Sequence, residues 1–113
     1  MSDNHDGLLL EAHKLAAELR KRGDDWADKD AAYRALEEVQ KTLLAEVFLE
    51  HEGSVAEREA QARASVKFRK HLTDIADARK EANRAKVAYD VYRIYVDMTR
   101  TNASSQRALV ELR

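Results

Sequence analysis

Four histidines are the side chains in this sequence best suited to bind a metal or transfer a proton. They are His5, His13, His51 and His71. No two of them form a His-x-x-x-His pair, and none has a glutamate three residues before it, so the ligand spacing of helical di-iron proteins is missing. We interpret the glutamates around His51, at positions 46, 50 and 52, as a solvated acidic helix end, and His71 with Asp74 as a surface pair.

The sequence also lacks a recognisable catalytic nucleophile and a phosphate-binding loop. Gly7, Gly23 and Gly53 are isolated, so no glycine-rich loop can cradle a phosphate. Ser54 precedes Glu57 in a capping-box pattern and is better explained as a helix cap than as a nucleophile. The chain has no cysteine. We therefore predict a protein that is not an enzyme and that needs no metal and no cofactor.

Basic residues are concentrated in one stretch, which leaves nucleic-acid binding open as an alternative function. Residues 57–86 carry nine basic and five acidic side chains. Phosphate contacts need only such cations, although charged helix surfaces often have this composition. The alternative function is therefore a nucleic-acid-binding accessory factor of a recombination system. Its candidate contacts are Arg63, Lys67, Lys70, Arg79 and Arg84.

Two apolar rows run along residues 75–99 with alternating spacings of three and four. The Ile75 row consists of Ile75, Ala78, Ala82, Ala85, Tyr89, Tyr92, Val96 and Thr99. The Val87 row consists of Val87, Val91, Ile94 and Met98. Because a helix turns about 100° per residue, the two rows lie roughly 160° apart, and one neighbouring helix cannot cover both. We predict that this end of the helix forms a homo-oligomer, preferably a two-fold dimer, and also contacts a protein partner. The predicted interface is Ala82, Ala85, Val87, Tyr89, Val91, Tyr92, Ile94, Val96 and Met98.

Composition and breaker residues predict an all-α fold in a single domain, residues 1–113. Charged residues make up 36% of the chain, and proline is absent. We expect helices at about residues 6–22, 27–51, 55–100 and 105–112, with Gly23 ending the first and Gly53-Ser54 separating the second from the third. Residues 1–53 carry 13 acidic and 7 basic side chains, and residues 54–113 carry 8 and 13. This asymmetry favours a hairpin in which the two halves lie side by side, and it also suits head-to-tail association between chains or a weak basic nucleic-acid face; charge alone does not choose between them. We predict a long antiparallel hairpin or coiled coil, with an additional N-terminal helix, in an oligomeric helical bundle. In this hairpin, Leu36, Val39, Leu43 and Val47 should face the third helix, with Leu36 near position 70.

Two C-terminal segments give the chain a resemblance to a group of proteins. They are residues 78–87, Ala-Arg-Lys-Glu-Ala-Asn-Arg-Ala-Lys-Val, and residues 97–101, Asp-Met-Thr-Arg-Thr, followed by Arg107-Ala108. Over roughly the last 50 residues the chain resembles short all-helical proteins of tailed bacteriophages and prophages. The resemblance implies a phage accessory protein that acts by contact on a recombination or host-defence complex. A second alternative function is inhibition of a host defence protein.

The sequence also bears on location. No apolar run approaches the ~20 residues that a membrane span requires. The N-terminus, Met-Ser-Asp-Asn-His-Asp, is polar and acidic and does not match a signal peptide. We expect a cytoplasmic protein without membrane contact, in the host cytoplasm if it is phage-encoded.

Overall fold

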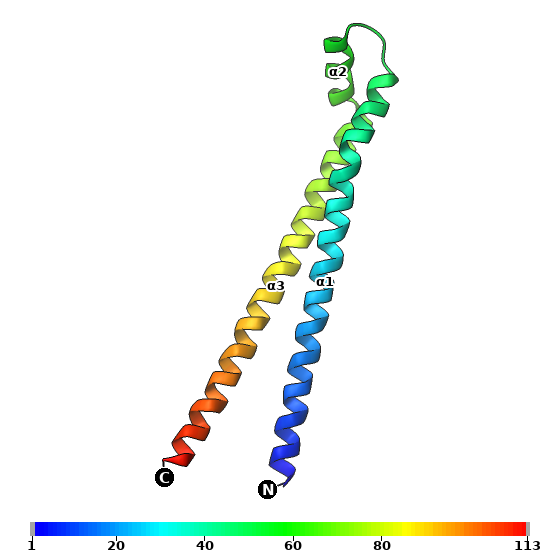
Figure 1. Cartoon of the computed structure of the whole chain (residues 1–113). Coiled ribbons are helices and arrows are strands. Elements are labelled where there is room, and N and C mark those ends of the chain that lie inside the picture. The colour runs from blue at the N-terminus through cyan, green and yellow to red at the C-terminus, as the bar shows by residue number, and fades with distance from the viewer. Residues whose placement is uncertain (1, 113) are drawn as a thin grey trace. The chain divides into compact units, whose positions relative to one another are not determined.

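The computed structural model describes residues 2–112, with side chains from residue 7 onward. Helix α1 spans Ser2–Leu49, α2 spans Val55–Ala64 and α3 spans Val66–Glu111, and no strand occurs in this part of the chain (Figure 1). The structure is 93% helical. These elements confirm the predicted all-α helical hairpin.

The predicted helix boundary at Gly23 is wrong, because α1 continues through it from Ser2 to Leu49. Gly53 is the only residue with a positive φ among those described, so Gly23 does not adopt the left-handed conformation of a C′ residue. A glycine inside a helix costs only about 1 kcal/mol relative to alanine, which the flanking helix-forming sequence can offset. The segments expected at 6–22 and 27–51 are therefore two parts of one helix.

The boundary at Gly53-Ser54 is confirmed, and a second break follows at Ser65. Gly53 has a φ of 121°, and the Ser54 hydroxyl accepts a 3.2 Å hydrogen bond from the Glu57 amide at the start of α2. The Ser65 hydroxyl donates to the Ala62 carbonyl at 2.7 Å and accepts from the Phe68 amide at 3.2 Å. Ser65 thus ends α2 and starts α3. The helix expected at 55–100 is divided there, and α3 continues through the segment expected to be separate at 105–112.

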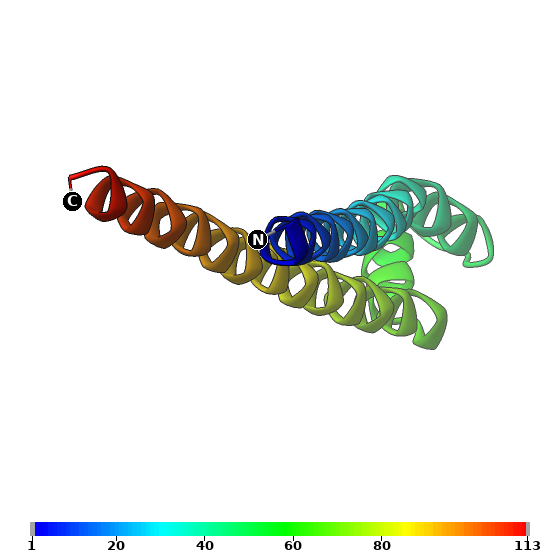
Figure 2. The ribbon, with the colours of Figure 1, turned by 90° about the horizontal axis from the view of Figure 1, so that it is seen from below.

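The chain forms two compact units, of which unit 2 comprises residues 27–83. In this unit α1 and α3 run antiparallel, side by side in both ribbon views (Figures 1 and 2). The Leu36 carbonyl lies 2.9 Å from His71 Nε2, one position from the partner expected near residue 70. Salt bridges join Lys67 to Glu50 at 3.1 Å and Lys29 to Glu81 at 3.9 Å. The predicted antiparallel pairing of these segments is confirmed.

The core of unit 2 is small and differs from the prediction at two positions. Val47, Ala62 and Phe68 are buried. Val39, expected to face α3, is 47% exposed, and the half-buried positions of α1 continue through Gln40 instead. The positions of α1 that contact one straight neighbouring helix recur at alternating spacings of three and four residues. Gln40 keeps this alternation between Leu36 and Leu43, whereas Val39 would place two spacings of three in succession after Tyr33. His71 is 9% exposed and bonded to a backbone carbonyl, so the expected surface pair with Asp74 is also wrong.

Unit 1 comprises the chain up to Trp26 and from Arg84 onward, and it too is an antiparallel pair of α1 and α3 segments. The Trp26 and Tyr89 rings lie 5.6 Å apart, and the Arg22 guanidinium lies 4.6 Å from the centre of the Tyr92 ring. Within this unit the two segments diverge toward their terminal ends (Figures 1 and 2). Leu8, which follows the heptad spacing of the covered side of α1, is accordingly 70% exposed.

Candidate protein-interaction surface

The Ile75 row is the covered side of α3. In unit 2, Ala82 is 5% exposed, and in unit 1 Ala85 is also 5% exposed. Tyr89, Tyr92 and Val96 are half-buried, and an added Cβ on Gly23 would lie 3.4 Å from the Tyr89 ring. Small side chains in this row permit close helix approach, and the tyrosines fill the wider space beside α1. This row is therefore used within the chain.

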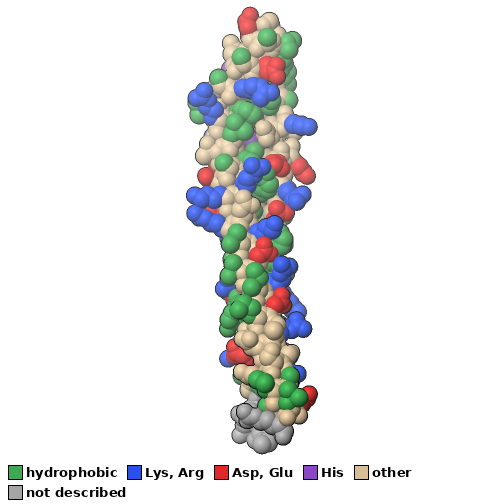
Figure 3. Space-filling model, turned by 90° about the vertical axis from the view of Figure 1, so that its left-hand side faces the viewer, with side chains coloured by type: hydrophobic (Ala, Val, Ile, Leu, Met, Phe, Trp, Pro, Cys, Tyr) green, Lys and Arg blue, Asp and Glu red, His purple; other side chains and the backbone are tan. Residues whose placement is uncertain are grey.

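The Val87 row is exposed on the other side of the same helix. Its four members, Val87, Val91, Ile94 and Met98, are between 55% and 61% exposed, although all are large and apolar. Hydrophobic side chains gather along this segment of α3 in the space-filling view (Figure 3). The row lies roughly 160° from the side that contacts α1, so the hairpin cannot cover it. Contiguous exposed apolar surface of this kind is typical of an interaction site.

The two edges of the Val87 row differ in chemistry. At 100° per residue, Asp90 and Asp97 flank one edge, and Ala88, Tyr95 and Asn102 flank the other. Tyr95 is 52% exposed, and its ring lies 5.7 Å from that of Tyr92. Beside the row, one edge therefore carries the carboxylates of Asp90 and Asp97, whereas the other offers the hydroxyl of Tyr95 and the amide of Asn102 as donors.

Further exposed leucines and a valine lie near the ends of α1 and α3 in unit 1. They are Leu8, Leu9, Leu10, Leu109, Val110 and Leu112. They were not among the interface residues predicted from the sequence. The run Leu8-Leu9-Leu10 was a usable signal, because three consecutive leucines cannot all face one neighbouring helix. Leu112 also keeps the spacing of the Val87 row.

The five candidate nucleic-acid contacts are divided between the two units, and two of them pair with carboxylates. Arg63 pairs with Glu59 at 3.5 Å, and Lys67 pairs with Glu50 at 3.1 Å. Arg84 belongs to unit 1, whereas the other four belong to unit 2. At 100° per residue, Lys67, Lys70 and Arg79, all in unit 2, point in directions spread over about half of the circumference of α3. The prediction that these residues contact nucleic acid stays untested.

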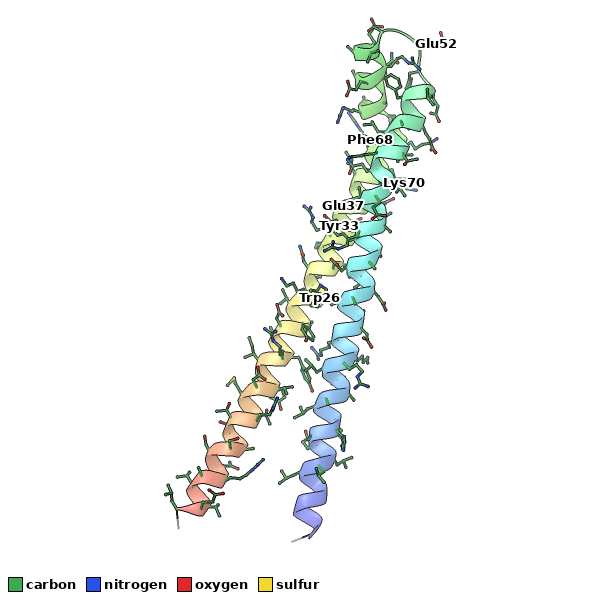
Figure 4. All side chains as sticks on the ribbon, in the orientation of Figure 1. Trp26, Tyr33, Glu37, Glu52, Phe68 and Lys70 are labelled. Carbon is green, nitrogen blue, oxygen red and sulfur yellow. The ribbon has the colours of Figure 1, made fainter. Side chains whose placement is uncertain are left out.

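Arg79 has a structural role in unit 2. Its guanidinium donates to the Tyr33 hydroxyl at 2.7 Å and 3.1 Å, and the hydroxyl in turn donates to Glu37, one turn further along α1 (Figure 4). Arg79 Nη2 also lies 4.0 Å from a Glu37 carboxylate oxygen. The hydrogen bond to Tyr33, together with the nearby Glu37 charge, raises the pKa of Arg79 above its ordinary value. This network links α3 to α1 and holds the Arg79 guanidinium against Tyr33 and Glu37 of α1.

Two other kinds of site, a metal centre and a membrane-spanning helix, were sought in the described part of the chain. Residues 2–112 contain no group of three or more His, Cys, Asp or Glu side chains arranged to hold a metal ion. Within the same residues, none of the helices combines the length and the apolar character that a membrane span needs. Comparisons with family models, curated proteins and solved structures find no match. The exposed Val87 row is therefore the candidate functional surface of this protein.

Proposed function

We propose that this protein is a non-enzymatic helical module that forms a homodimer through the Val87 row and acts by protein–protein contact. The observation that carries the proposal is the exposure of four large apolar side chains on the side of α3 that α1 leaves open. Fully burying such a side chain contributes roughly 1.5–3 kcal/mol. Each of these four side chains still exposes more than half of its surface. Burying that surface in a dimer would therefore contribute about 1 kcal/mol per side chain to the free energy of association.

This modest gain per residue predicts a dimer that dissociates on dilution, because association also costs translational and rotational freedom. A two-fold dimer is the simplest arrangement, since the same row supplies both sides of the interface. A dimer would leave Leu8, Leu9 and Leu10 near the start of α1 as a second apolar surface for another protein. The proposed contact function agrees with the resemblance to phage accessory proteins. A phage origin of this chain and the pathway in which it acts remain predictions.

The test is the mass of two double variants in light scattering at tens of micromolar. Val91→Asp with Ile94→Asp places two carboxylates in the centre of the row and should give monomers with reduced helicity. Val55→Asp with Val66→Asp is the matched control, because both valines are well exposed at helix starts, where an acidic residue is favourable. The control should remain dimeric. Equal masses for the two double variants would contradict the proposal.

A further inference from the structure

Heptad positions on α3 define the interface that a second copy would meet. Val87 and Ile94 take position d, and Val91 and Met98 take position a. Positions g are then Asp90 and Asp97, and positions e are Ala88, Tyr95 and Asn102. In coiled coils, residues at e and g flank the apolar centre and determine the orientation of the partner helix.

An antiparallel pair would place each acidic edge against its own copy. Position g faces g of the partner in that orientation, so Asp90 of one chain would lie beside Asp97 of the other, twice in each dimer. Other antiparallel registers of the row still bring an aspartate against an aspartate, or against Asn83 or Ser104. Like charges placed directly across an interface are unfavourable, and no basic residue occupies the facing positions.

A parallel pair brings the acidic edge against the donor edge. Position g then faces e of the next heptad in the partner, so Asp90 meets Tyr95 and Asp97 meets Asn102. The tyrosine hydroxyl and the asparagine amide can each donate a hydrogen bond to a carboxylate. The parallel register also sets Leu112 opposite itself, beyond the intervening a and d positions Thr101, Ser105 and Ala108.

From this charge complementarity we infer that the occupant of the Val87 row is a second copy of the chain, with its α3 parallel and in register. The inference rests on the proposed homodimer and adds its orientation. Because α1 contacts the opposite side of α3 in unit 1, it does not obstruct this pairing. In the resulting dimer, each residue of the row faces the equivalent residue of the second copy across the two-fold axis.

Disulfide cross-linking tests the orientation directly, because the chain has no cysteine of its own. In the parallel dimer, Met98→Cys and Val87→Cys should each cross-link with itself under mild oxidation, at least fivefold more than Arg93→Cys on the polar side of α3. Positions 87 and 98 are about 16 Å apart along a helix, well beyond disulfide reach. A mixture of the two variants should therefore give no mixed disulfide.

The outcomes separate this inference from the proposed function. Sedimentation of the unmodified chain establishes whether a dimer forms. A dimer in which only the mixture of Val87→Cys and Met98→Cys cross-links is antiparallel, which overturns the inference but leaves the proposed function intact. A dimer without enhanced cross-linking in either experiment uses another surface, and it overturns both. A monomer likewise overturns both.

Discussion

Replacement of Gly23 by alanine should stabilise the protein, because α1 continues through this position. The added methyl group would meet Tyr89 Cε2 at 3.4 Å and Cδ2 at 3.6 Å, ordinary van der Waals distances. Alanine favours a helix over glycine by about 0.8–1.0 kcal/mol, so we expect a gain of about 1 kcal/mol in the free energy of unfolding. At an m-value of about 2 kcal/mol/M, this raises the midpoint of urea denaturation by about 0.5 M.

The experiment is urea denaturation followed by circular dichroism at 222 nm, with both proteins at the same concentration. The opposite control is Gly53→Ala, since Gly53 has a φ of 121° that side-chain-bearing residues rarely adopt, and strain of about 1–3 kcal/mol should lower the midpoint. If Gly23 instead ended a helix in the left-handed conformation, Gly23→Ala would also lower the midpoint. That sign would refute the continuous α1.

Val47→Ala should lower the free energy of unfolding by about 2 kcal/mol because Val47 is 1% exposed, whereas Val39→Ala, at 47% exposure, should change it by less than about 0.5 kcal/mol; urea midpoints distinguish them. Ser65→Ala removes the hydroxyl that bonds both α2 and α3 and should cost about 1 kcal/mol in the same assay. Asp90→Asn with Asp97→Asn should not tighten the dimer in sedimentation equilibrium if α3 pairs in parallel, and a severalfold lower dissociation constant would instead indicate facing carboxylates.

The sequence was sufficient to predict the helical hairpin and both rows of α3, because apolar spacing determines which sides of a helix can be covered. The Ile75 row is the covered side, and the Val87 row is exposed within the chain. The turn was also predictable, since Gly53 provides a conformation that other residues avoid and Ser54 provides the next cap.

The remaining features depend on competition between effects of similar size. At Gly23 the glycine penalty of about 1 kcal/mol is too small to end a helix whose flanking residues pack against α3. At Ser65 neither glycine nor proline marks the break, which is instead made by one hydroxyl bonded on both sides. Gln40 faces α3 in place of Val39 because of the path that α3 takes along α1. That path cannot be read from the hydrophobicity of the residues around position 39.

Sedimentation equilibrium of the unmodified protein from about one to one hundred micromolar tests the central claim, self-association through the Val87 row, most directly. The exposed apolar row predicts a mass that rises with concentration toward twice the 12.9 kDa of one chain. The same series on Val91→Asp with Ile94→Asp should stay at the mass of one chain. A mass of 12.9 kDa for the unmodified protein throughout the series would contradict the claim.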